Sequence, residues 1–99
     1  MKILVFGKTF NLARMHLFNM IEDINYGEIK KVSNSMNEAY VELKNGDTYQ
    51  ALNISENAKG YKCDKVYINM EVDSNIIERI IKPIICMSQL PEDEQIVYY

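Results

Sequence analysis

The sequence is poor in histidine and cysteine, two residue types from which zinc sites and many active sites are built. Its 99 residues include one histidine, His16, and two cysteines, Cys63 and Cys86. The cysteines do not form a CxxC pair, and no histidine lies near them to complete a zinc site. We therefore expect no bound metal and two reduced thiols, since disulfides are uncommon inside cells. A disulfide stays an alternative, because pairing depends on the distance between the two Cα atoms.

A basic excess and a long apolar run are also missing. The formal net charge is -3, whereas DNA-binding domains usually carry an excess of lysine and arginine that neutralises phosphates. No apolar run approaches the roughly 20 residues that span a bilayer, and the apolar start at residues 3–6 is too short for a signal peptide. We expect no membrane segment and no nucleic acid as a direct ligand.

The composition is that of one globular domain covering residues 1–99. Hydrophobic residues make up 47% of the chain and charged residues 25%, and no linker, repeat or low-complexity segment interrupts it. Isoleucine, lysine and asparagine are abundant, and their AT-rich codons are typical of low-GC bacteria and their phages. We therefore expect a cytoplasmic location in a bacterial host cell.

The first quarter of the chain predicts a buried strand followed by a helix. Residues 3–6 are continuously apolar, as in a strand that is buried on both faces. Thr9 or Asn11 is the predicted N-cap of the helix, and Gly27 is predicted to end it in a left-handed conformation. One face of this helix is apolar and is formed by Ala13, Leu17, Met20, Ile21 and Ile24. A second face is polar except for Phe18.

The middle of the chain predicts antiparallel strands. Residues 28–33 form a first short candidate, and alternating patterns follow over residues 39–43 and 48–54. Between the last two lies Asn45-Gly46, which favours a type I′ turn because both residues tolerate positive φ. The sequence therefore predicts a β-hairpin here, followed by a polar loop over residues 55–62.

The last third predicts a second strand–helix–strand unit. Residues 65–70 form a buried strand, Asp73 or Ser74 caps a helix, and residues 95–99 form the last strand. Pro83 should kink or break that helix. The complete order is β-α-β-β-β-β-α-β. We therefore expect an α/β domain with a mixed sheet, an antiparallel hairpin and two packed helices, with α+β as the alternative.

Two short motifs lie where a nucleotide site would be, and both are incomplete. Gly7-Lys8-Thr9 matches the end of a phosphate-binding loop, GxxxxGK[ST], but the strand that precedes it leaves no room for the rest. At the end of the next buried strand, Asn69 occupies the position where a magnesium-binding aspartate is expected. We therefore expect no catalytic residues and no cofactor. A phosphate near Lys8, Thr9 and Asn69 stays an alternative.

Most of the chain resembles part of the ATPase core of phage large terminases and related P-loop motors. Residues 59–64, Lys-Gly-Tyr-Lys-Cys-Asp, are similar to the family's loop (Arg/Lys)-Gly-(Tyr/Arg)-x-x-Asp. Residues 66–69 resemble the Walker B strand, residues 95–99 a later strand, and residues 3–24 the strand and helix before the hairpin. The Walker A loop is missing and Asn69 replaces the Walker B aspartate. The resemblance therefore implies a remnant that keeps the α/β fold without ATPase chemistry.

These observations favour recognition over catalysis. Tyr26, Tyr61 and Tyr99 occupy predicted loop or terminal positions, and tyrosine is enriched at protein interfaces. Ordinary half-buried tyrosines are the alternative interpretation. We expect a non-enzymatic phage- or mobile-element-type protein that binds another protein and inhibits or regulates a host or defence enzyme. The alternatives are a vestigial nucleotide-binding ATPase-like module and a self-associating structural protein that forms homo-oligomers.

Overall fold

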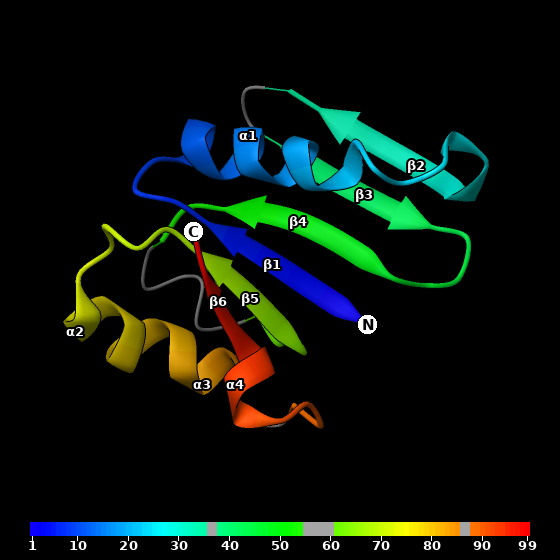
Figure 1. Cartoon of the computed structure of the whole chain (residues 1–99). Coiled ribbons are helices and arrows are strands. Elements are labelled where there is room, and N and C mark those ends of the chain that lie inside the picture. Colours follow the sequence, from blue (N-terminus) through cyan, green and yellow to red (C-terminus); the bar gives the residue numbers. More distant parts are fainter. Residues whose placement is uncertain (36–37, 55–60, 86–87) are drawn as a thin grey trace.

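The structure, a computed structural model, describes residues 1–35, 38–54, 61–85 and 88–99. One mixed sheet has six strands in the order β2-β3-β4-β1-β5-β6 (Figure 1). The strands are β1 Lys2–Phe6, β2 Ile29–Asn34, β3 Ala39–Leu43, β4 Thr48–Leu52, β5 Lys65–Ile68 and β6 Ile96–Tyr98. The helical segments are α1 Phe10–Ile21, the 3-10 helix η1 Tyr26–Glu28, α2 Ser74–Ile76, the π-helical η3 Ile77–Ile81, α3 Lys82–Ile85 and α4 Glu92–Gln95. The α/β fold with a mixed sheet is confirmed.

The first strand occupies the middle of the sheet. β1 pairs in parallel with both β4 and β5, and β5 pairs in parallel with β6. β2 and β3, and β3 and β4, pair antiparallel, so the predicted hairpin extends the sheet on the other side of β1. Because β1 has a neighbour on each side and a helix layer on each face, its residues 3–6 are all buried. This explains the uninterrupted apolar run.

Helix α1 covers the face of the sheet to which Val5 points. Its buried residues Ala13, Leu17 and Ile21 pack against side chains of β1, β3 and β4. The helix begins after Thr9, whose hydroxyl accepts a hydrogen bond from the Leu12 N–H over 3.2 Å, so Thr9 and not Asn11 is the N-cap. Its end differs from the prediction. The helix stops at Ile21, and Gly27 lies within the separate helix η1 without positive φ.

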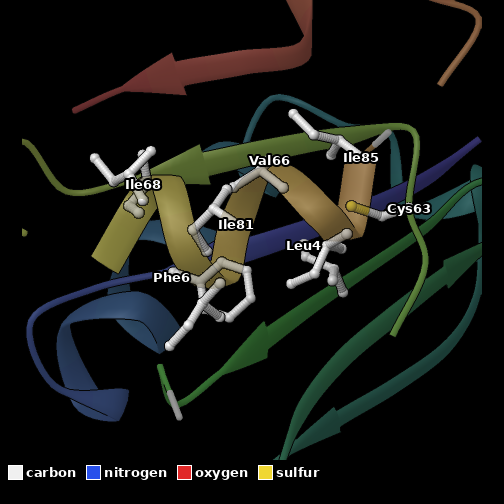
Figure 2. Packing of buried hydrophobic residues seen from close by; sticks show 10 residues of the cluster. Leu4, Phe6, Cys63, Val66, Ile68, Ile81 and Ile85 are labelled. Atoms are coloured by element: carbon white, nitrogen blue, oxygen red, sulfur yellow. The ribbon is translucent and has the colours of Figure 1, made fainter. Parts of the chain in front are cut away.

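The segment from α2 to α3 covers the opposite face, to which Leu4 and Phe6 point. Figure 2 shows these side chains packed against Val66, Ile68, Ile81, Ile85 and Cys63. The α-helical hydrogen-bond pattern is interrupted ahead of Pro83, as predicted, but as a π-helical stretch in which the Lys82 N–H donates to the Ile77 carbonyl. A π turn adds one residue and so accommodates a proline that has no N–H to donate.

The hairpin is confirmed, but its turn is not of type I′. The Gly46 N–H donates to the Leu43 carbonyl over 3.1 Å, and the Leu43 N–H donates to the Asp47 carbonyl over 2.8 Å. Gly46 has a φ of 97°, and no non-glycine residue in the described part of the chain has positive φ. Asn45 therefore cannot adopt the type I′ conformation. The pattern is a three-residue loop that ends in a glycine bulge.

The strands at 48–54 and 65–70 are shorter than predicted, ending at Leu52 and Ile68. Most of the loop predicted over residues 55–62 lies outside the described residues, as do Lys59 and Gly60 of the family-like loop and Cys86. None of the helices in the described ranges is long and apolar enough to cross a membrane.

Candidate interaction groove

The three tyrosines predicted to bind a partner lie on separate parts of the molecule. Tyr26 lies on η1 and is 91% exposed. Tyr61 is half-buried, with its ring centroid 5.5 Å from the Lys2 ammonium nitrogen at the start of β1. Tyr99 is half-buried beside Phe6, at the other end of β1. The structure therefore does not bring these tyrosines into one surface.

Tyr99 is held by contacts within the protein. Its hydroxyl donates to the Phe6 carbonyl over 2.7 Å, and its ring stacks on His16 with 3.6 Å between centroids. Burial raises the pKa of Tyr99 to about 12 and lowers the pKa of His16. His16 thus packs α1 against Tyr99, and this contact is typical of a packing residue.

Lys8, Thr9 and Asn69 do not converge on a phosphate site. Lys8 lines a depression of about 380 Å³ at the carboxyl ends of β1, β4 and β5, together with the acidic residues Glu71 and Asp73. The Thr9 hydroxyl caps α1, and the Asn69 side chain accepts from the Glu71 N–H over 2.8 Å. Two carboxylates beside one ammonium group disfavour a polyanion.

The described residues also offer no metal cluster. Nowhere in the described ranges do three or more histidine, cysteine, aspartate or glutamate side chains gather closely enough to hold an ion. Cys63 is buried, and burial raises the pKa of its thiol to about 12. The protonated thiol is a poor ligand and a poor nucleophile.

A groove lies between the second half of α1 and the edge strand β2. It has a volume of about 340 Å³ and is lined by Phe18, Ile21, Glu22, Ile24, Tyr26, Ile29, Val32 and Asn34. We call it the α1–β2 groove. Val32 in its wall is 50% exposed. A smaller depression of about 270 Å³ shares Phe18 and Asn34 and adds Met15, which is 53% exposed. The other residues that line this depression, Arg14 and Asn19, are polar, so Met15 and Phe18 are its apolar part.

Local contacts hold the two walls of the groove in place. Arg14 donates to Asn11 over 2.6 Å and to the Asn34 side chain over 3.4 Å, which ties α1 to the end of β2. At the other end, the Asn25 side chain accepts from the Gly27 N–H over 3.0 Å and caps η1. This cap fixes the segment that carries Tyr26. One contact thus joins the two walls of the groove, and the other is local to the segment that carries Tyr26.

The opposite face of β2 is basic. Both Lys30 and Lys31 are exposed. The Lys30 ammonium lies 3.5 Å from a Glu42 carboxylate oxygen, and the Lys31 ammonium lies 5.9 Å from the centroid of the Tyr40 ring. A register shift between Ile29 and Lys31 places both lysines opposite the same stretch of β3. The edge strand therefore presents an apolar groove on one face and two lysines on the other.

The sequence predicted Tyr26 as a contact residue and did not predict the groove beside it, and the role of Tyr26 stays a prediction. One signal was present, since Phe18 is the apolar residue on the otherwise polar face of α1. Val32 could not be found in the same way, because a valine in a strand gives no sign of which face is covered. Comparisons with protein-family models, with curated proteins and with solved structures give no match, so the likeness to terminase ATPase cores stays a prediction.

Proposed function

We propose that this chain binds another protein through the α1–β2 groove and performs no catalysis. The observation that carries the proposal is the exposure of Tyr26 and Val32 at a mainly apolar groove beside a sheet edge, with the exposed Met15 in the adjoining depression. Large contiguous apolar patches are uncommon on monomeric proteins and often mark interaction sites.

Energetics supports this use of the surface. Burying one large apolar side chain contributes about 1.5–3 kcal/mol, and tyrosine is among the residues that dominate binding energy at interfaces. Covering Tyr26 and Val32 together would therefore contribute a favourable free energy of a few kcal/mol, which must be set against the translational and rotational freedom lost on association. The hydrogen bonds of Arg14 and Asn25 restrict the walls, which lowers the ordering entropy that binding would cost.

The wider role stays part of the proposal. We propose a phage- or mobile-element-type protein that inhibits or regulates a host or defence enzyme in the bacterial cytoplasm. The packed His16 and the protonated Cys63 support a non-enzymatic role, because each is a residue type from which nucleophilic or acid–base catalysis is commonly built.

The test is capture of a partner with matched variants as bait. The tagged full-length chain, its Val32→Asp variant and a Met70→Asp control are each incubated with lysate of the cells that carry the gene. Met70 is 69% exposed and lies just beyond β5, away from the groove. We expect the same partner with the original chain and with Met70→Asp, and about tenfold less with Val32→Asp.

Two results would count against the proposal. One is capture that is equal with Val32→Asp. The other is capture that is lost with Met70→Asp as well. Circular dichroism of each bait shows whether it is folded, and Val32→Thr is a milder second variant that keeps the β-branched shape if the aspartate disturbs the strand.

A further inference from the structure

We propose that the occupant of the α1–β2 groove is an extended segment of the partner protein that pairs with β2 as an additional strand. Its residues alternate between apolar side chains in the groove and acidic side chains over Lys30 and Lys31. This inference rests on the proposed function and adds the chemistry of the partner.

The backbone of β2 is available for pairing. β2 is the last strand at its end of the sheet, and in the described ranges no strand pairs with its outer side. The Ser35 N–H donates to the Glu38 carbonyl over 2.8 Å, which fixes the alternation of antiparallel hydrogen bonds between β2 and β3. Because hydrogen-bonded pairs recur at every second residue, Ser33 and Lys31 also bond to β3. The N–H and C=O groups of Val32 and Asn34 therefore point outward.

The side chains of an added strand would meet two different surfaces. Val32 lies opposite Val41 in the register, on the face that α1 covers, and lines the groove. Lys31 lies opposite Glu42, on the other face. Because strand side chains alternate between faces, every second residue of the added strand would enter or flank the apolar groove. The intervening residues would lie beside the lysines.

The positive charges of Lys30 and Lys31 favour acidic residues at those intervening positions and disfavour a second copy of this chain. The Lys30 side chain is 65% exposed and is paired with Glu42. Among the described residues, the contact given for the Lys31 ammonium is with the Tyr40 ring and not with a carboxylate. Lysines on an edge strand oppose its pairing with an identical strand, since like charges are brought together. The same charges attract an acidic strand.

The test begins with a library of displayed peptides of about ten residues, long enough for one strand. Selection is run on the full chain, and binders that also bind Val32→Asp are discarded. We expect an enriched pattern that alternates apolar and acidic residues. Affinity for the double variant Lys30→Glu/Lys31→Glu should fall about fivefold or more, whereas Lys8→Glu/Lys62→Glu, with the same change in net charge, should bind as the original chain does.

Hydrogen exchange measured by NMR then tests the strand itself. When a selected peptide binds, the amides of Val32 and Asn34 should gain protection, and those of Lys31 and Ser33, already bonded to β3, should change little. Peptides that carry N-methyl groups on the residues facing β2 should lose binding, because the added groups remove the donors.

Several outcomes would overturn this inference. A selection that yields no groove-dependent binder would do so, as would binders that form a helix, that are basic, or that leave Val32 and Asn34 unprotected. Light scattering that shows a dimer lost in Val32→Asp would assign the edge to a second copy. If capture of the natural partner still depends on Val32 in any of these cases, the protein-binding proposal stands and the strand-pairing inference alone fails.

Discussion

Gly7, the residue that follows β1, has no room for a larger side chain. A Cβ there would lie 2.8 Å from the backbone nitrogen of Ala13 and 3.0 Å from the carbonyl oxygen of Thr9. Neither backbone atom can move without shifting the start of α1. We expect Gly7→Ala to lower the free energy of unfolding by about 1–3 kcal/mol, as measured by urea denaturation.

Gly27→Ala is the matched control for this prediction. A Cβ at Gly27 would meet its nearest atom, the Asn25 side-chain oxygen, at the ordinary contact distance of 3.5 Å. We expect a change within about 0.5 kcal/mol. Equal losses in the two variants would show that the effect belongs to glycine replacement in general and not to the crowded turn at Gly7.

The buried thiol of Cys63 predicts how stability depends on pH. Burial raises its pKa from an ordinary 9.0 to about 12. The unfolded chain therefore loses this proton first, so the contribution is fully present below about pH 9 and is lost as the pH rises toward 12. The raised pKa of Tyr99, from 10.0 to about 12, adds a similar loss at higher pH.

The measurement compares denaturation of the chain and its Cys63→Ala variant between about pH 8 and pH 10, where the cysteine effect precedes that of the tyrosine. Cys86 is replaced by serine in both proteins, so that they differ in one thiol. We expect Cys63→Ala to be less stable at low pH, because it leaves a cavity, but to lose less stability with rising pH. Parallel pH profiles would contradict the prediction.

At the scale of elements, the hairpin shows which features the local sequence can predict. The alternation over residues 39–43 and 48–54 placed both strands, although the second ends at Leu52. In β3 every second residue is buried, whereas in β4 only Ala51 is buried and the other residues are half-buried. The turn type was wrong for a local reason. The Asn45 side chain accepts from the Asp47 N–H over 2.9 Å, which offers asparagine a role that does not require positive φ.

The positive φ of Gly46 predicts how replacing this residue changes the stability of the protein. Its φ of 97° is strained for residues with a side chain, although nothing lies within 4 Å of a Cβ there. We expect Gly46→Ala to lower the free energy of unfolding by about 1–2 kcal/mol through backbone strain alone. Gly46→Asn should lose less, because asparagine tolerates positive φ better. Urea denaturation of both variants measures the difference, and an asparagine variant as weak as the alanine variant would argue for another cause.

The groove could be predicted only in part, because its walls come from different elements. Phe18 and Tyr26 were each noted from the sequence, one as an apolar residue on a polar helix face and the other as a tyrosine in a loop. That they line one groove with Val32 depends on which edge of the sheet lies beside α1. Helix spacing and strand alternation give the face of a residue within its own element, and they do not give the neighbours of that element.

The same limit applies to the whole molecule. The sequence predicted a mixed sheet, but the position of β1 between β4 and β5 is a non-local property. In the register, Val5 lies beside Ala51 on one side and Tyr67 on the other, and both are more than 40 positions away in the chain. β1 is therefore tied to both halves of the chain, while β2 is tied to β3 alone.

This arrangement predicts a gradient of hydrogen exchange across the sheet. Opening β1 requires separation from two strands and two core clusters, so the Val5 amide should exchange only when the whole protein unfolds. The outward amides of Val32 and Asn34, on the edge strand β2, should exchange much faster in the free protein. Exchange is followed by NMR at two protein concentrations. Protection of Val32 equal to that of Val5 would contradict an open edge, and protection that rises with concentration would show that a second copy covers it.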